Sequence, residues 1–152
     1  MSAIDKLIEI ASTEVGYLEK SSNSQLDSKT ANAGTANYTK YWRDIKPEYQ
    51  GQPWCACFVT WCFVNAFGKN NAQKLLKYYP YVYCPTMANL FTLNANPKVG
   101  DIVIIYRTGE RYPKRYSSVV TGIAIIEEII RTKDVDAVSY THLRAHETRG
   151  NL

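Results

Sequence analysis

Residues 51–67, GQPWCACFVTWCFVNAF, form a strongly apolar stretch between two structure-breaking signals. The segment Gly51-Gln52-Pro53 precedes it and Gly68 follows it, and both interrupt regular structure. From Cys55 onward, apolar side chains recur at intervals of three and four residues, which is the spacing of one helix face. Further apolar side chains widen that face. The pattern therefore predicts a central, buried helix from about Cys55 to Phe67.

Other helical patterns surround this segment. Residues 3–15 repeat apolar side chains at helical spacing, Ser2 and Asp5 resemble a capping box, and Gly16 is expected to stop the helix. Shorter patterns predict helices over 36–44, 71–77 and 85–93. Residues 20–35 are rich in Ser, Asn, Thr and Gly and poor in apolar side chains, so we predict a loop there.

The pattern changes after Asn96-Pro97. Residues 101–106 (DIVIIY) and 119–130 (VVTGIAIIEEII) are rich in β-branched side chains, which favours two strands. Helices followed by strands predict an α+β fold. Because two strands alone bury little surface, we expect the sheet to be incomplete.

Composition excludes several classes of protein. The chain has 152 residues, of which 45% are hydrophobic and 21% charged, as in one globular domain. No apolar run is long enough to span a bilayer, and the start, MSAIDKLIEI, has no basic segment ahead of an apolar core, so we predict neither a membrane span nor a signal peptide. The net charge of +4 is scattered, which argues against nucleic-acid binding.

The chain has four cysteines, Cys55, Cys57, Cys62 and Cys84. The first three share one predicted helix, where their spacing prevents a disulfide, and no zinc-binding spacing is present. We therefore predict thiols, with no metal and no cofactor. Cys84 precedes Pro85 and could cap a helix, but nothing in the sequence positions a partner near it.

Cys55 is the candidate nucleophile because it opens the central helix. Backbone N–H groups and the helix dipole at this position favour a thiolate. The N–H of Cys55 would also lie close to the oxyanion that forms when a thiolate attacks an amide. The alternative is that Cys55 is a small buried apolar residue, which is how we interpret Cys57 and Cys62.

The last part of the chain has a distinct origin. Residues 138–148, VSYTHLRAHET, match the translation of one reading frame of a common transposon-based sequencing adapter. We therefore predict that native sequence ends near Ala137, giving a truncated domain over 1–137 and an adapter-derived tail over 138–152. Both histidines, His142 and His146, fall in the tail, so their H-x-x-x-H spacing does not predict a metal site.

Several segments resemble one family. In order they are GQPWCACFVTWCF (51–63), PKVGDIVII (97–105) and TGIAII (121–126), supported by EVGYLEK (14–20) and NYTKYW (37–42). Together they resemble the CHAP family, the cysteine, histidine-dependent amidohydrolases and peptidases of bacteria and phages, over roughly residues 3–130. The resemblance implies a papain-like α+β fold, with N-terminal helices packed on a small antiparallel sheet that is incomplete here. It also implies a peptidoglycan hydrolase, either amidase or endopeptidase, with Cys55 as nucleophile.

Two departures from the family put activity in doubt. A family histidine starts the second strand in a pattern like H-T-G-I, and here Val120 occupies that position. The family's third polar residue would follow Ala137, where the adapter stands. The resemblance therefore implies a chain that is inactive as written. The alternative is a non-catalytic cell-wall-binding module on the same scaffold, and a third possibility is an unrelated cytoplasmic helical protein.

The expected partner is peptidoglycan, with no nucleic acid and no membrane, and the sequence does not indicate an oligomeric state. Trp54, beside the nucleophile, and Tyr17 and Glu19, in the EVGYLEK segment, are candidate substrate-groove residues, and each could equally be structural. Because there is no signal peptide, the protein would act on the cell wall after release or lysis.

Overall fold

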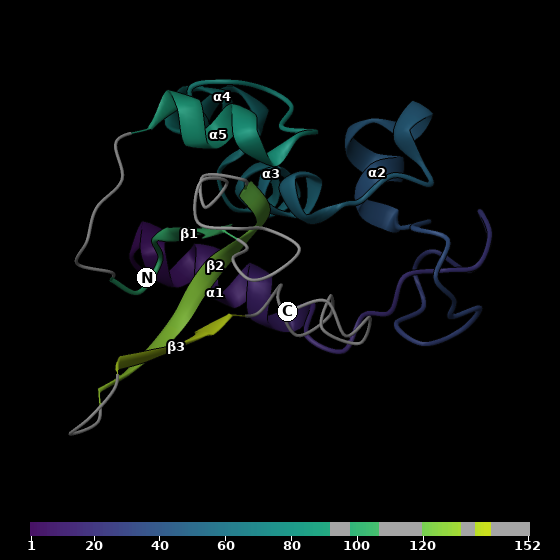
Figure 1. Cartoon of the computed structure of the whole chain (residues 1–152), viewed down its shortest axis with the longest axis horizontal. Coiled ribbons are helices and arrows are strands. Elements are labelled where there is room, and N and C mark those ends of the chain that lie inside the picture. The colour runs from purple at the N-terminus through teal and green to yellow at the C-terminus, as the bar shows by residue number, and fades with distance from the viewer. Residues whose placement is uncertain (92–97, 107–119, 132–135, 141–152) are drawn as a thin grey trace.

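The computed structural model describes residues 1–91, 98–106, 120–131 and 136–140, with side chains for 1–87, 89–91 and 98–102. Figure 1 shows the order of its elements. The helices are α1 (Ala3–Thr13), α2 (Lys40–Ile45), the 3₁₀ helix η1 (Pro47–Tyr49), α3 (Cys55–Phe67), α4 (Lys69–Leu76) and α5 (Cys84–Leu90). The strands are β1 (Ile102–Tyr106), β2 (Val120–Arg131) and β3 (Asp136–Tyr140). Within the described ranges, no helix combines the length and apolar character needed to cross a bilayer.

The start of α1 confirms the predicted capping box. The Ser2 hydroxyl accepts a hydrogen bond from the Asp5 N–H at 3.1 Å, and the Asp5 carboxylate accepts one from the Ser2 N–H at 3.3 Å. These contacts satisfy two N–H groups at the start of the helix. The helix ends at Thr13, two residues before the predicted end, and the chain turns at Gly16, whose φ of 94° favours glycine.

The central helix α3 is confirmed with both predicted ends. It runs from Cys55 to Phe67, and ten of its 13 residues are buried. Its apolar side chains are needed on several faces because α1, α2 and α4 all contact it. The chain leaves the helix at Gly68, where φ is 83°. Because α3 is buried on several sides, it is the central helix against which the other helices pack.

Helix α2 begins four residues later than the sequence predicts. Tyr38 is held extended by a β-bridge to Lys20, and Asn37 has a φ of 61°, so neither residue has helical backbone. The Thr39 hydroxyl then accepts a hydrogen bond from the Trp42 N–H at 3.1 Å and caps the helix. Long-range pairing thus overrides the local pattern at this helix start.

A buried aromatic cluster around Tyr41 joins α2, α3 and the loop that follows α1. Its ring lies 4.9–5.4 Å, between centroids, from four other rings: Tyr17, Trp54, Phe58 and Trp61. The Tyr41 hydroxyl donates a hydrogen bond to Glu14 Oε1 at 2.9 Å, and the Lys40 ammonium lies 2.7 Å from the same oxygen. The carboxylate of Glu14 is therefore buried with two donors, which offsets the cost of removing its charge from water.

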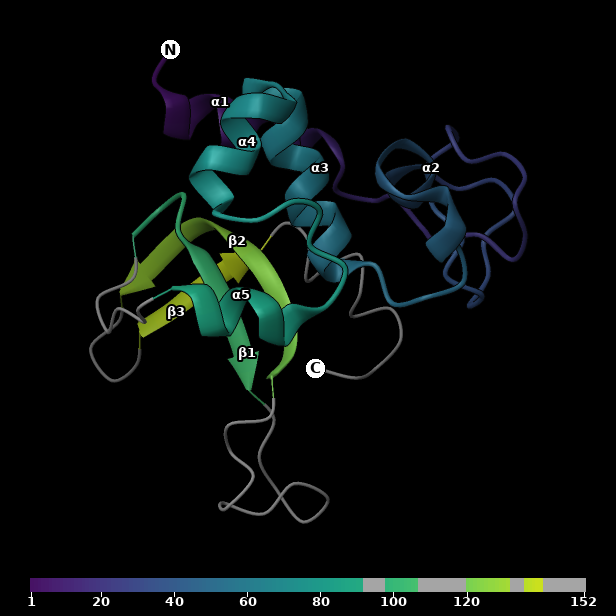
Figure 2. The same ribbon diagram turned by 90° about the horizontal axis from the view of Figure 1, so that it is seen from above.

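Beyond α5 the backbone forms three antiparallel strands in the order β1-β2-β3. Val103 lies opposite Ala124, and Ile129 lies opposite Val138. Strand β2 contacts α1, α3 and α5, and Figure 2 shows α5 lying alongside it. β1 and β2 coincide closely with the two strand patterns in the sequence. β3 crosses the predicted boundary at Ala137, and the division of the chain at that residue stays a prediction.

The prediction of a papain-like α+β fold, with helices packed on a small antiparallel sheet, is wrong. The part of the chain whose side chains the structure describes, which ends at Ile102, is 49% helix and contains no complete strand or sheet. The physical reason is that apolar side chains before Asn96 recur at helical spacing, while the polar loop between α1 and α2 makes β pairs only as the isolated bridges of Lys20. How side chains of β2 and β3 pack lies outside the described residues, so no papain-like core is shown.

Replacing Tyr41 with phenylalanine tests the contribution of its hydroxyl. The ring contacts remain in Tyr41→Phe, but Glu14 loses a buried hydrogen bond. Hydrogen bonds to charged groups contribute about 1.5–3 kcal/mol, and we expect the free energy of unfolding to fall by about that amount. Urea denaturation measures it, with Tyr78→Phe as the matched control because the Tyr78 side chain is 46% exposed. A Tyr41→Phe protein as stable as the control would contradict this role.

Alkaline pH should destabilise the fold. Burial raises the pKa of Tyr17 from 10.0 to about 12, and burial together with Glu14 raises the pKa of Tyr41. Both rings stay neutral in the folded chain, so their stabilising contribution is complete below pH 10 and is lost as pH rises towards 12. Burial lowers the pKa of Lys20 below its ordinary value of 10.5. Its loss of a proton therefore increases the free energy of unfolding as pH rises, but only up to pH 10.5. We expect the free energy of unfolding to fall above pH 10.5 by about 1.4 kcal/mol per pH unit for each tyrosine, measured by urea titration; a Tyr17→Phe variant should show a smaller slope.

Candidate functional site

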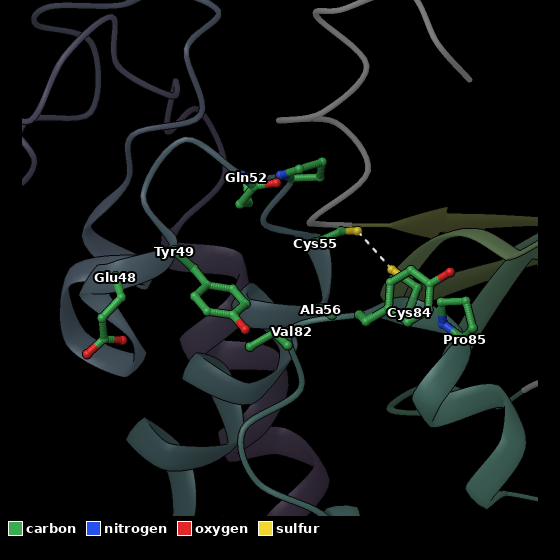
Figure 3. Close-up of a pocket in the computed structure, with 10 residues that line it drawn as sticks. Glu48, Tyr49, Gln52, Cys55, Ala56, Val82, Cys84 and Pro85 are labelled. Atoms are coloured by element: carbon green, nitrogen blue, oxygen red, sulfur yellow. Dashed lines mark hydrogen bonds between the residues drawn. The ribbon is translucent and has the colours of Figure 1, made fainter.

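A cleft of about 680 Å³ opens where α3 begins. One side is formed by η1 and the loop that follows it, including Tyr49 and Gln52. The opposite side is formed by the segment that leads into α5, including Tyr83 and Cys84. Cys55 lies between the two sides at the first turn of α3 (Figure 3). Residues far apart in the sequence thus meet around one sulfur atom.

Cys55 is the first residue of α3, as the sequence predicts. Its side chain lines the cleft although the residue is only 4% exposed. The N-cap residue, Trp54, makes no side-chain cap hydrogen bond, so no capping carboxylate or hydroxyl offsets the partial positive charge of the helix start. This position favours negative charge on the sulfur. The nucleophilic role itself stays a prediction.

Cys84 is the site residue that the sequence does not reveal. Its sulfur lies 3.1 Å from that of Cys55, and Figure 3 shows the two side chains pointing toward one another. Cys84 is the first residue of α5 and is half-buried. The hydrogen bond with Cys55, followed by burial, raises the pKa of Cys84. The raised pKa keeps the Cys84 thiol protonated at neutral pH, and either sulfur can be the donor of the hydrogen bond between the two.

The sequence held one weak signal for this pair. Both cysteines stand at predicted helix starts, but 29 residues separate them and the intervening chain includes α4. A helix start alone does not say which other helix start it faces. Only the packing of α5 against the rest of the molecule brings the second sulfur into the cleft.

Cys57 and Cys62 confirm the interpretation of these residues as packing. Both side chains are 0% exposed, and both belong to the hydrophobic core. Burial raises the pKa of each thiol well above its ordinary value. These two sulfurs are therefore neutral and out of reach of the cleft, in contrast to the pair at its wall.

Tyr17 and Glu19 do not lie where a substrate groove would need them. The Tyr17 side chain is 0% exposed, and its hydroxyl donates to the Leu26 carbonyl at 2.6 Å. Glu19 is 4% exposed and accepts a hydrogen bond from the Asn37 N–H at 2.7 Å. Both side chains anchor the loop between α1 and α2. Their burial corrects the expectation that they line a groove.

Trp54 stands next to Cys55 but faces the core. Its side chain is 0% exposed and its ring stacks on Tyr41 at 5.4 Å between centroids. It is not among the residues that line the cleft. Trp54 therefore acts on the site by fixing the start of α3, and direct contact with a substrate is not supported.

The cleft has no imidazole from the part of the chain that the structure describes. Val120, which stands where the resemblance to the CHAP family implies a histidine, is the first residue of β2 and pairs with Tyr106. His142 and His146 lie outside the described residues. The carboxylate of the cleft, on Glu48, lies across it from the two sulfurs in Figure 3. Among residues with described side chains, no three His, Cys, Asp or Glu come together to hold a metal ion.

Comparison of the chain with protein-family models, curated proteins and solved structures gives no match. The resemblance to the CHAP family therefore rests on the sequence segments quoted above and stays a prediction. What the fold contributes is a cleft with two facing thiols at its wall.

The two classes of cysteine should differ in reactivity. At neutral pH we expect iodoacetamide to alkylate Cys55 at least about tenfold faster than Cys57 or Cys62, because a thiolate at a helix start reacts and a buried thiol does not. Peptide mass spectrometry over a time course measures each site, and urea-unfolded protein serves as the control in which the differences should disappear. Equal labelling of Cys55 and Cys62 in the folded chain would count against an activated Cys55.

Proposed function

We propose that this chain derives from cysteine-dependent hydrolases that cleave an amide bond of peptidoglycan, with Cys55 at the nucleophile position. The observation that supports the proposal is the sulfur of Cys55, at the first residue of a buried helix and on the wall of a cleft. In such a reaction the thiolate attacks the amide carbonyl carbon, the amine leaves with a proton, and water then hydrolyses the thioester.

The cleft walls suit a ligand with both polar and apolar surface. Tyr49 and Tyr83 both line the cleft, and these residues are 36% and 65% exposed. Exposed tyrosines offer an apolar ring face together with a hydroxyl that can donate or accept a hydrogen bond. A strand of sugars and short peptides carries surfaces of both kinds. These two rings replace Tyr17 and Glu19 as the substrate-contact candidates.

The reaction would lack its general base in this chain. Valine at position 120 cannot accept a proton, and the cleft has no described imidazole. General acid–base assistance contributes about 10²–10⁴ to the rate, and a coupled catalytic set loses more when one member is missing. The Cys84 thiol is a poor substitute because its pKa is raised, so it gives up its proton reluctantly. We therefore propose that the chain as written does not turn over substrate.

A non-catalytic cell-wall-binding module is the second candidate. It is favoured by Val120, since a chain that binds without cleaving needs no base at that position. Such a module would keep the exposed cleft tyrosines but would not depend on the Cys55 sulfur. The two candidates differ in whether restoring the base restores cleavage.

Purified cell walls test the proposal. We expect the unchanged chain to leave their turbidity constant, and Val120→His to clear them at a rate at least about 10²-fold above it. Adding Cys55→Ala to Val120→His should abolish the gain, and this double variant is the matched control. Clearing that survives Cys55→Ala would overturn the nucleophile assignment.

Co-sedimentation with the same walls separates the remaining outcomes. A Val120→His protein that binds walls without clearing them supports the binding module. If no form of the chain either binds or clears them, both wall-directed functions are wrong. The Tyr83→Ala variant should weaken sedimentation in either case, because it removes an exposed ring from the cleft.

A further inference from the structure

The facing thiols of the cleft carry an inference that is independent of cell-wall hydrolysis. Two sulfurs 3.1 Å apart need to approach by only about 1 Å to reach the disulfide bond length of about 2.05 Å. Neither sulfur is locked within a helix interior, since Cys55 and Cys84 are each the first residue of a helix. A small movement of the α5 start would therefore join them.

We propose that Cys55 and Cys84 form a dithiol site that exchanges with small-molecule disulfides and closes to an intramolecular disulfide. The substrates are compounds of the type RSSR, where R is a small polar group such as the glutathione tripeptide. The cleft of about 680 Å³ at the two sulfurs gives such a molecule access to the site.

The exchange balances in two steps. The Cys55 thiolate attacks one sulfur of RSSR, so that a Cys55–SR bond forms, the RS–SR bond breaks, and RS⁻ leaves with the electron pair and takes up a proton. The Cys84 sulfur then loses its proton and attacks Cys55 Sγ, forming the Cys55–Cys84 bond and expelling the second RS⁻. The two protein thiols lose two electrons and RSSR becomes two RSH.

The geometry assigns different roles to the two sulfurs. Cys55 is the first residue of the 13-residue helix α3, whose dipole favours negative charge on its sulfur, so Cys55 is the attacking thiol. Cys84 is half-buried beside it and is placed to resolve the mixed disulfide. Cys57 and Cys62 are 0% exposed, so RSSR does not reach them. The site is therefore selective for two of the four thiols.

Closure would also remove Cys55 from amide chemistry, because a disulfide sulfur is not a nucleophile. The dithiol site does not rest on that function, however. Disulfide formation is read from mass and thiol count, without cell walls. A chain that fails to bind or clear walls can still form the Cys55–Cys84 bond, and the two failures are distinguishable.

The test equilibrates the full chain, reduced and then freed of reductant, with glutathione disulfide at neutral pH. Acid quenching and maleimide labelling count the remaining thiols, and peptide mass spectrometry locates the linkage. We expect two of the four thiols to be lost together, a Cys55–Cys84 peptide, and no lasting glutathione adduct. Glutathione added in excess should restore all four thiols.

Variants decide the roles of the two sulfurs. Cys84→Ser should stop at one glutathione on Cys55, and Cys84→Ala gives a second test if serine disturbs folding, which circular dichroism checks. Cys57→Ala is the matched control and should still form the bond. A lasting adduct on Cys55 in the unchanged chain, a linkage through Cys57 or Cys62, or four unreacted thiols would each overturn the proposal.

Discussion

One buried carboxylate ties the helical part of the molecule together. Glu14 is the C-cap residue of α1, and its Oε1 accepts a hydrogen bond from the Tyr41 hydroxyl and pairs with the Lys40 ammonium, so that one charged contact joins the end of α1 to α2. The ring of Tyr41 in turn stacks on Trp54, the residue that leads into α3. A charge buried this deeply is stable only when its donors are in place, so removing either donor should destabilise the contact between α1 and α2.

The aromatic cluster around Tyr41 also packs against the start of α3, where the cleft lies. Trp54, the N-cap residue of α3, is buried against the ring of Tyr41, and this packing fixes the position of the first turn of α3. Cys55 lies in that turn, at the end of the helix that lines the cleft. The other sulfur arrives from α5, which is joined to α3 through α4. The position of the Cys55 sulfur therefore depends on the packing of the core, whereas the position of the Cys84 sulfur depends on how α5 packs against the rest of the molecule.

Local signals predicted the helical part well, and their failures have a common cause. The capping box of α1 and both ends of α3 could be predicted from a few neighbouring residues. The start of α2 could not, because the β-bridge between Lys20 and Tyr38 joins residues from different parts of the chain. The same holds for the site: Cys55 has a local signature, whereas Cys84 does not. Tyr17 and Glu19 belong to a segment that resembles a family motif, yet their side chains point inward to secure a loop, which residue type alone cannot distinguish from a groove.

Trp54 at the N-cap of α3 has a consequence for attempts to improve the protein. Serine, aspartate or asparagine at this position would make a better cap, and such replacements often strengthen helices by about 1 kcal/mol. Here they would empty the space that the indole fills in the core and place an acceptor on the N–H groups beside Cys55. Capping and core packing thus make opposite demands on residue 54, and tryptophan at this position favours the packing of the core over the stronger cap.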